Sequence, residues 1–235
     1  MLDAATHVTG LTLDEAYDVQ DRLTASRLKE GRAVVGYKLG YTSAVMRRQM
    51  NIADPNFGPL FDDMVLPDGC RTDRFLQPRV EPEIGLVLRH DLAGDGLLLH
   101  EVCDAVAEVR ACLEVVDSIW RDYKFTAEQN TADGSSAAGV VIGPRLDVDP
   151  IDCHRLAIDL REDGVTVGTA KSAAAAGHPL AGLVWLCGQL ARRGCGLRAG
   201  EFVITGGLTV ALPLRRGVAL EAVFGARSSV RLARL

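Results

Sequence analysis

Two glutamates separated by one residue, Glu81 and Glu83, form the pattern in this sequence that most directly suggests chemistry. Because side chains alternate across a β-strand, both carboxylates would project from the same face. The residues that follow, from Ile84 to Leu88, are apolar on both faces, which is typical of a buried strand. Two adjacent buried carboxylates are costly unless a cation neutralises them, and oxygen ligands favour Mg²⁺, Mn²⁺ or Ca²⁺. Two solvated glutamates at a strand edge are the alternative, and the pattern supports both interpretations equally.

A third acid, Glu114, lies in a second apolar run, between Leu113 and Val115. A carboxylate with apolar neighbours on both sides is either a metal ligand or the partner of a cation. Three carboxylates would leave about three positions of an octahedral Mg²⁺ shell for a bidentate substrate and water.

Lys38 lies between Gly36 and Gly40 in a strand-like run. Glycines permit a close approach of the backbone to a ligand, and a lysine near a metal ion has its ammonium form disfavoured, which suits proton transfer. A surface lysine at the end of a strand is the simpler interpretation, and the local sequence by itself favours it.

The segment from Thr131 to Gly139 is a loop of small and polar residues that leads into an apolar strand. Such a loop can present backbone amides and hydroxyls to an anion. It lacks the Gly-x-Ser-x-Gly pattern of the serine hydrolases, so we do not expect a nucleophilic serine. His178 precedes Pro179 and an apolar helical run, and we expect it to be a structural cap rather than a base.

Length and charge limit the classes of function. A chain of 235 residues fits one large domain or at most two small ones. The net charge of −5 and the scattered basic residues argue against a nucleic-acid or membrane-surface partner. The cysteines have no metal-binding or disulfide spacing, and no apolar run reaches the roughly 18–20 residues of a membrane span. A reducing cytoplasm is therefore the expected compartment.

The elements that must position these residues begin with a helix. Thr12 and Glu15 form a capping-box pattern, and apolar residues at helical spacing run from Leu13 to Glu30. Further helices are expected over 44–50, 100–109 and 180–193, and a turn is expected over 54–56.

The rest of the pattern predicts strands. Asp163 and Gly164 stand between two alternating runs and indicate a hairpin. Many short strands, few helices and no βαβ repeat predict an α+β fold dominated by a rolled or sandwiched sheet. The expected strands cover residues 33–39, 79–88, 111–118, 139–142, 156–161, 165–170, 201–205, 218–223 and 229–232.

The sequence resembles the fumarylacetoacetate hydrolase superfamily over nearly its whole length, in particular the branch of 2-oxo acid hydratases and decarboxylases. Each motif alone is weak, but the ordered set is highly specific. The motifs that carry the resemblance are Glu15–Gln20, Gly36–Gly40, Phe57–Met64, Gln77–Glu83, Leu113–Ser118, Gly177–Leu180 and Thr205–Gly207.

The resemblance implies a mixed β-roll or sandwich with a few flanking helices. Residues 1–235 would form one catalytic domain, with a helical portion over 1–60 packed on a β-rich core over 61–235. Mg²⁺ or Mn²⁺ would bind Glu81, Glu83 and Glu114. The resemblance implies catalytic roles for Lys38, Asp63 and Ser136, and substrate contacts for Thr42, Leu60, Ser135, Thr205 and Gly206. It further implies a small-molecule 2-oxo acid substrate and a homo-oligomer, with a complex with a pathway partner enzyme as an option.

Two activities of this branch share one intermediate. A 2-oxo-3-hexenedioate decarboxylase loses the distal carboxylate and leaves a dienolate, whereas a 2-hydroxypenta-2,4-dienoate hydratase ketonises the dienol and adds water. In both, the metal acts as a Lewis acid at the developing enolate oxygen. We prefer decarboxylation, because Asn56 replaces the aspartate typical of the hydratases and because residues 122–125, 135–136 and 206–209 resemble the decarboxylase form.

Two further alternatives are a non-catalytic partner subunit and a carbon–carbon hydrolase. The intact glutamate triad argues against the first. The second needs a base such as a His–Glu pair, and no histidine lies near the motif that carries it. Some positions depart from the family: Ile119 replaces an arginine and Gly134 an asparagine. A substrate without the usual second carboxylate, a biosynthetic role or reduced activity therefore stay open.

Overall fold

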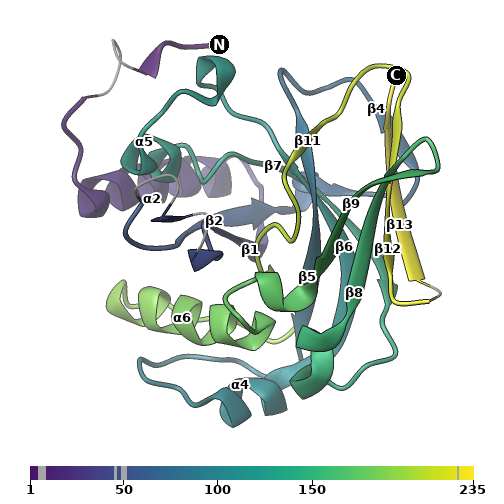
Figure 1. Ribbon diagram of the computed structural model, residues 1–235. Coiled ribbons are helices and arrows are strands. Elements are labelled where there is room, and N and C mark those ends of the chain that lie inside the picture. The colour runs from purple at the N-terminus through teal and green to yellow at the C-terminus, as the bar shows by residue number, and fades with distance from the viewer. Residues whose placement is uncertain (5–8, 45–46, 49–51, 227) are drawn as a thin grey trace.

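A mixed sheet of eight strands forms the centre of the molecule. The computed structural model describes residues 1–4, 9–44, 47–48, 52–226 and 228–235 (Figure 1). In order across the sheet, the strands are β2 (Asn56–Phe61), β1 (Val34–Gly40), β10 (Phe202–Ile204), β5 (Arg79–Leu88), β6 (Val106–Val116), β7 (Ala137–Arg145) and β3 (Val65–Leu66), and β11 (Leu212–Pro213) also pairs with β5. β1 runs parallel to β10, and β3 runs parallel to β7.

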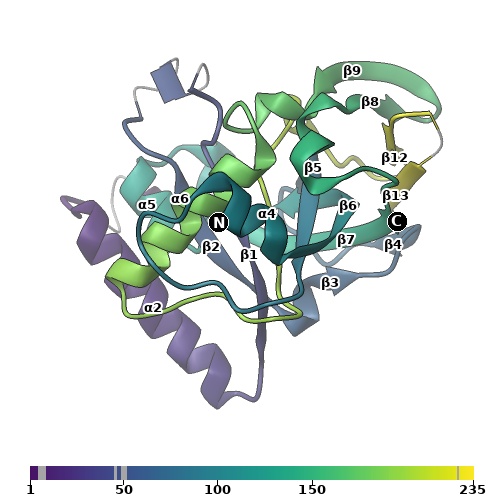
Figure 2. The same cartoon turned by 90° about the horizontal axis from the view of Figure 1, so that it is seen from below.

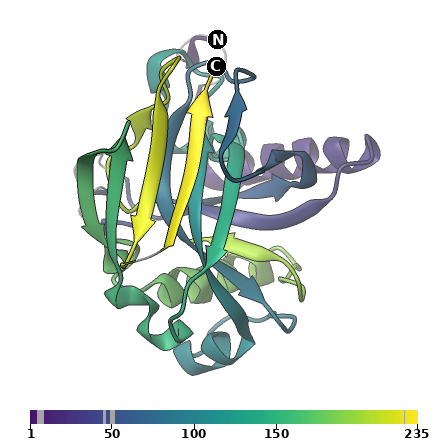
Figure 3. The same cartoon turned by 90° about the vertical axis from the view of Figure 1, so that its right-hand side faces the viewer.

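A second sheet of five strands packs on the first. In order, it contains β4 (Cys70–Thr72), β13 (Ser228–Arg234), β12 (Ala219–Phe224), β8 (Ala157–Glu162) and β9 (Val165–Lys171). β13 contacts β6 and β7, and β12 contacts β6. Figure 3 looks onto this sheet, with the yellow β12 and β13 in front of the larger sheet.

On the other side of the molecule, the described part of the chain includes four α-helices of six residues or more. They are α2 (Leu13–Lys29), α4 (Leu99–Ala105), α5 (Ala127–Ala132) and α6 (Pro179–Arg192). α2 packs on α5, and α4 packs on α6 (Figures 1 and 2). Short 3₁₀ turns cover Asp62–Met64, Arg121–Tyr123, Pro150–Arg155 and Ser172–Ala174. Within the described residues, no helix is both long and apolar enough to cross a membrane.

The two faces of the larger sheet have different environments. Leu113 and Val115 of β6 belong to the main hydrophobic core, together with Val230 of β13. Cys112, which has the opposite parity on β6, belongs to a small separate cluster with Leu60 of β2. Because parity decides the face of a strand, Glu114 lies on the same face as Cys112, away from the main core.

The expected fold class is confirmed, as are several elements. β5 has the expected bounds, and the capping box of α2 is present, with Thr12 Oγ1 accepting from the Glu15 N–H and Glu15 accepting from the Thr12 N–H. The hairpin between β8 and β9 turns at Asp163 and Gly164, which both have positive φ values, of 46° and 85°. This conformation is the one that an Asp-Gly turn favours.

Other expectations were wrong. The helix expected over 100–109 ends at Ala105, because Val106 already pairs with Leu88 as the first residue of β6. The turn expected over 54–56 ends before Asn56, which opens β2, a strand that the periodicity missed. α5 was also missed. The helix expected over 44–50 falls partly outside the described residues.

Residues 1–60 supply strands as well as a helix. β1 and most of β2 come from this part of the chain, and β1 hydrogen-bonds β10, the neighbour of β5. The N-terminal portion is therefore built into the central sheet rather than lying on it as a helical layer, because the sheet takes its strands from distant parts of the sequence.

α6 begins at His178, whose ring lies between two backbone groups. Its Nδ1 accepts a hydrogen bond from the Leu180 N–H at 3.1 Å, and its Nε2 lies 2.9 Å from the Ile151 carbonyl oxygen. Nδ1 can accept only when it is unprotonated, so the contacts assign the neutral ring with its proton on Nε2. Burial, with a contribution from the nearby His154, lowers the pKa of His178. The expected role as a structural cap is confirmed.

We expect the contribution of His178 to stability to depend on pH. Its folded pKa lies below the ordinary 6.5, so the contribution is complete above pH 6.5 and is lost as the pH falls through the folded pKa. His178→Asn keeps a capping side chain that does not titrate and should remove this part of the loss. Urea unfolding of both proteins at pH 8 and pH 5 measures the difference. Equal losses in both would contradict the expectation, and His100→Asn, at an exposed histidine, is the control.

Candidate metal centre and substrate cavity

Three glutamates converge on one face of the central sheet. In the antiparallel pair of β5 and β6, Glu81 lies opposite Glu114 and Glu83 lies opposite Cys112, so the three carboxylates share a face. One oxygen of each lies within 4.8 Å of the others. Glu83 and Glu114 are fully buried, whereas Glu81 keeps some exposure to the neighbouring cavity. These separations suit a single cation with ligand distances of about 2.0–2.6 Å.

The hydrogen bonding of the carboxylates leaves room for such a cation. Glu83 Oε2 accepts from the Gly206 N–H at 2.7 Å, and Glu114 Oε1 pairs with Lys38 Nζ at 3.1 Å. Among the described residues, none donates a hydrogen bond to Glu83 Oε1 or Glu114 Oε2. Buried carboxylate oxygens without a donor are costly. Three carboxylates against one lysine also leave two negative charges, so the residues present fit a divalent hard cation.

The same imbalance appears in the acidities of the three groups. Burial, and then the charge of Glu114, raises the pKa of Glu81 to about 7. Burial and the two other carboxylates raise the pKa of Glu83 well above its ordinary value, and burial raises the pKa of Glu114. The protein without a cation therefore favours protonated carboxyls at this place.

Lys38 reaches the carboxylates from β1. It is almost fully buried, and its Nζ donates to the Ser135 carbonyl oxygen at 3.0 Å in addition to its ion pair with Glu114. Burial lowers the pKa of Lys38, but the charges of Glu114, Glu83 and Glu81 outweigh this effect and raise it. The carboxylates thus favour the ammonium form, which is the opposite of the direction expected from a metal ion alone. The interpretation of Lys38 as a surface lysine is wrong.

The serine loop that contacts Lys38 is held in an unusual backbone conformation. Ser135 and Ser136 both have positive φ values, of 59° and 55°. Ser135 Oγ donates to Asn56 Oδ1 at 2.9 Å, and Asn130 Nδ2 donates to Ser136 Oγ at 2.8 Å. Consecutive non-glycine residues with positive φ are strained, and such strain persists only where the surroundings hold it. Here it directs the Ser135 carbonyl toward Lys38.

A cavity of about 730 Å³ opens in front of Lys38 and Glu81. Thr42, Ser135 and Ser136 also line it, so five of the expected site residues face the same space. Its wall includes aromatic side chains, Tyr41, Tyr123 and Phe125. A cavity of this size accommodates a small organic acid.

Comparison with known proteins places the chain in a family. It is 31% identical over 94% of its length to 2-oxo-hept-4-ene-1,7-dioate hydratase of Escherichia coli and covers 86% of that protein. It is 36% identical over 94% of its length to 2-keto-4-pentenoate hydratase of Paraburkholderia xenovorans (strain LB400), of which it covers 83%. The chain belongs to the family of 2-oxo acid hydratases and decarboxylases. No family model matches the sequence.

Solved structures agree with this family. The crystal structure of 4-oxalocrotonate decarboxylase from Pseudomonas putida G7, complexed with magnesium and adipate, matches with a TM-score of 0.94 and 31% identity, over 100% of this chain and 90% of that chain. A putative fumarylacetoacetate hydrolase family protein from Yersinia pestis CO92 matches with a TM-score of 0.65 and 15% identity over 85% of this chain and 92% of that chain, which shows a shared fold. The expected resemblance is confirmed.

The remaining expected site residues of this family member lie in three different places. Gly206 contacts the glutamates directly, and Thr205 is buried beside them, with Oγ1 donating to the Ile84 carbonyl oxygen at 3.2 Å. Leu60 is fully buried in the small apolar cluster and does not line the cavity. Asp63 pairs with Arg27 at 2.6 Å on a partly exposed surface and does not line the cavity either. The structure therefore places neither Leu60 nor Asp63 in the lining of the cavity.

Several cavity residues escaped the sequence reasoning. Arg79 lines the cavity, and its position two residues before Glu81 on the same strand was the signal that could have revealed it. Gly207 is needed for space, because a Cβ at this position would lie 2.3 Å from Glu81 Oε1. Asn130, which supports Ser136, lies in α5 and carried no recognisable signal.

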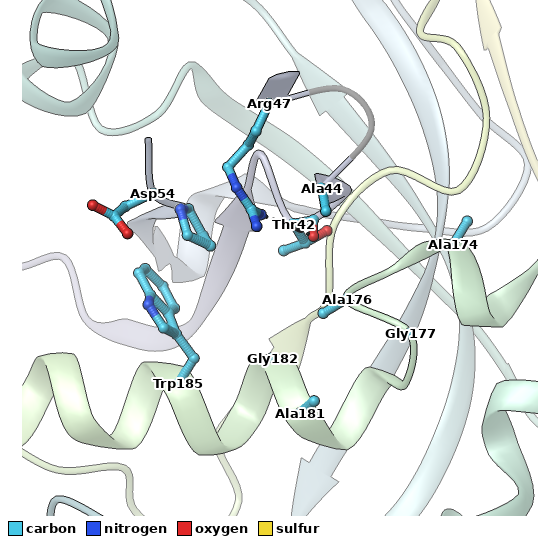
Figure 4. Close-up of a pocket in the computed structure, with 11 residues that line it drawn as sticks. Thr42, Ala44, Arg47, Asp54, Ala174, Ala176, Gly177, Ala181, Gly182 and Trp185 are labelled. Atoms are coloured by element: carbon cyan, nitrogen blue, oxygen red, sulfur yellow. Dashed lines mark hydrogen bonds between the residues drawn. The ribbon is translucent and has the colours of Figure 1, made fainter. Parts of the chain in front are cut away.

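A second, smaller cavity of about 500 Å³ lies behind the turn that follows β1 (Figure 4). Trp185 of α6 and Arg47 face each other across it, and Thr42 lines both cavities. Arg47 Nη1 donates to the carbonyl oxygens of Tyr41, at 2.6 Å, and Thr42, at 3.1 Å. Arg47 thereby supports the turn that contributes Thr42 to the larger cavity.

We expect the effect of Mg²⁺ on stability to increase with pH. The ordinary pKa of a glutamate is 4.5 and that of Glu81 is about 7, so the stability contributed by its protonation is complete below pH 4.5 and is lost as the pH rises through about 7. A cation that binds the ionised carboxylates offsets this loss. Thermal unfolding with EDTA or Mg²⁺ should show a larger rise in Tm with Mg²⁺ at pH 8 than at pH 5.

Glu83→Gln removes one of the ionised groups and one ligand. It should lose less stability than the unmodified protein between pH 5 and pH 8 in EDTA, and its Tm should no longer respond to Mg²⁺. Asp147→Asn, at an exposed carboxylate, should behave like the unmodified protein. An undiminished response of Glu83→Gln to Mg²⁺ would remove Glu83 from the ligand set.

Proposed function

We propose that the protein is a divalent-metal-dependent lyase that acts on a 2-oxo acid through its enolate, and that the reaction is decarboxylation of a 2-oxo-3-hexenedioate-type substrate. The observation that carries the proposal is the convergence of Glu81, Glu83 and Glu114 with Lys38 at one end of a cavity that fits a small organic acid. The names of the relatives, hydratases and decarboxylases of 2-oxo acids, support it.

The three glutamates would hold Mg²⁺ or Mn²⁺. The bound ion would supply Lewis-acid stabilisation to the oxygen that becomes negative as the enolate forms, a contribution worth several kcal/mol. Magnesium in the related decarboxylase structure supports this choice of ion.

Lys38 would hold a proton beside the developing negative charge. Its ammonium form is favoured by the glutamates and is fixed by two contacts, to Glu114 Oε1 and to the Ser135 carbonyl oxygen. In decarboxylation, the bond to the distal carboxylate breaks, its electron pair moves through the carbon–carbon double bond toward the 2-oxo group, and CO₂ leaves. A proton on Nζ can then neutralise the enolate oxygen.

The serine loop and the turn after β1 would orient the substrate. We assign substrate contacts to Thr42, Ser135 and Ser136, which line the cavity. Thr205 and Gly206 would act indirectly, because Gly206 fixes Glu83 and Thr205 precedes it. The positive φ of Gly206, 102°, and a Cβ position only 2.1 Å from Thr42 Oγ1 leave no alternative to glycine there.

The second candidate is hydration of a 2-hydroxypenta-2,4-dienoate, which the named hydratases among the relatives favour. The same groups could ketonise a dienol and place water. Asn56 argues for decarboxylation instead, because it stands where an aspartate is typical of the hydratases. Its Nδ2 donates to Asn130 Oδ1 at 3.1 Å and to Thr131 Oγ1 at 3.0 Å, and an aspartate in its place could not donate these hydrogen bonds.

We further propose that the chain acts as one catalytic domain in the cytoplasm and as a homo-oligomer. The six cysteines form no disulfide, which suits a reducing compartment. Val165 and Val167 on the edge strand β9 and Val210 are exposed, which suits burial against another copy.

An absorbance assay distinguishes the two activities. With Mg²⁺ and 2-oxo-3-hexenedioate, we expect consumption of the conjugated substrate with release of one CO₂ per molecule. With 2-hydroxypenta-2,4-dienoate, formation of 4-hydroxy-2-oxopentanoate would instead establish the hydratase. If neither substrate is turned over with Mg²⁺ or Mn²⁺, both the decarboxylase and the hydratase assignments are contradicted.

Lys38→Ala tests the role of the ammonium group. We expect metal affinity to be kept or increased, because the variant removes a positive charge beside three carboxylates, whereas kcat should fall by about 10²–10⁴-fold. Calorimetry with Mn²⁺ and the absorbance assay measure the two effects. Lys171→Ala, at an exposed lysine of β9, should leave both unchanged. Activity of Lys38→Ala close to that of the unmodified protein would contradict the role.

A further inference from the structure

Arg79 shares the substrate cavity with the metal-binding glutamates. It is the first residue of β5, two positions before Glu81, so both side chains project from the same face, and the two Cα atoms lie about 6.8 Å apart along the strand. Both line the cavity of about 730 Å³.

Among the described residues, two cationic side chains line this cavity, Lys38 and Arg79, and they differ in their contacts. Lys38 pairs with Glu114. Arg79 is half-buried, and no ion pair or hydrogen bond joins its side chain to another described residue, although its charge lowers the pKa of Glu81. Its five N–H donors are therefore available to a ligand. The guanidinium fork matches the two oxygens of a carboxylate, with which it forms the stronger class of hydrogen bond.

Tyr123 holds the guanidinium in place. The Arg79 Cζ lies over the Tyr123 ring, 4.3 Å from its centroid, in a cation–π arrangement. The Tyr123 hydroxyl lies within hydrogen-bonding distance of two carbonyl oxygens, that of Gln77 at 3.0 Å and that of Val116 at 2.9 Å. The ring is thus fixed to both β6 and the segment that precedes β5.

The loop that contains Tyr123 has a strained backbone. Asp122 and Tyr123 both have positive φ values, of 56° and 57°. The Gln77 side chain holds this loop: its Oε1 accepts from the Asp122 N–H at 3.1 Å, and its Nε2 donates to the carbonyl oxygens of Ser118, at 2.9 Å, and Trp120, at 2.6 Å. Strain that the surroundings maintain is found where a side chain must be placed for a ligand.

The acidic residues around the cavity do not neutralise Arg79. Asp122 and Glu128 also line it, but neither forms an ion pair with Arg79, and Asp122 is exposed, where solvent screens its charge. Ile119 does not line the cavity. Arg79 is therefore the cation of the lining, within the described residues, that is free to meet a second negative charge.

We propose that Arg79, supported by Tyr123, binds a second carboxylate at the end of the substrate opposite the 2-oxo group, and so selects 2-oxo dicarboxylates of six or seven carbons over 2-oxo monocarboxylates. The inference rests on the proposed function, because it requires the 2-oxo end to lie at the glutamates. Five carbon–carbon bonds in an extended chain span about 6 Å by ordinary bond lengths and angles, close to the spacing of Arg79 and Glu81 along β5.

Two saturated 2-oxo acids test this without turnover. 2-Oxohexanedioate and 2-oxohexanoate have the same chelating end, differ in the distal carboxylate and lack the double bond that the reaction uses. In calorimetry with Mg²⁺, we expect the unmodified protein to bind the dicarboxylate about 10- to 100-fold more tightly. Arg79→Gln should lose this preference and keep its affinity for 2-oxohexanoate within about twofold. Arg79→Lys should keep part of the preference, and Arg71→Gln, at an exposed arginine of β4, all of it.

The outcomes separate the subsite from the metal centre. Equal affinities in the unmodified protein, or an equal loss for both ligands in Arg79→Gln with an unchanged Tm, would overturn the subsite and leave the metal centre intact. If neither ligand binds in a Mg²⁺-dependent way, the proposed function fails and the inference falls with it. Tyr123→Leu, which keeps the arginine but removes its platform, should reduce the preference less than Arg79→Gln.

Discussion

Burial of three carboxylates beside a single lysine is the constraint on which the rest of this structure depends. Glu83 and Glu114 are inaccessible to solvent, and Lys38 offsets only one of the three charges. Such a cluster is tolerated when the carboxyls take up protons or a cation binds them. The neighbouring backbone is arranged around this requirement: Gly206 donates its N–H to Glu83, and Gly207 leaves space for Glu81.

The larger sheet can hold this cluster because its two faces have different surroundings. On β6, the residues of one parity pack with the second sheet and supply stability. The residues of the other parity, including Glu114, face away from that core, so the charged groups cost none of its apolar packing. Two strained loops line the cavity: the loop at Asp122 follows β6, and the loop at Ser135 follows α5. Of the seven described non-glycine residues with positive φ, five line this cavity: Tyr41, Asp122, Tyr123, Ser135 and Ser136.

Membership of the family narrows the chemistry but does not by itself choose a reaction. Hydratases and decarboxylases of 2-oxo acids would need the same stabilised enolate, so the proposed roles of the glutamates and Lys38 would serve either. The proposed contact of Arg79 and Tyr123 with the distal end of the substrate would decide which substrate binds rather than which reaction follows, because a relative named as a hydratase also acts on a dioate. Residues at that end therefore carry more information about the substrate than the metal centre does.

The sequence by itself determined β5 with its paired glutamates, the capped helix α2, the fold class and the family, because alternation, capping and motif order are local signals. It could not decide whether Glu81 and Glu83 were buried or solvated, since burial depends on β6 and β1 lying beside β5. Lys38 and Glu114 are 76 positions apart, and Asp63 was assigned a role although it pairs with Arg27 elsewhere. Only tertiary structure sets such contacts, because strand order and register bring together side chains that no local pattern connects.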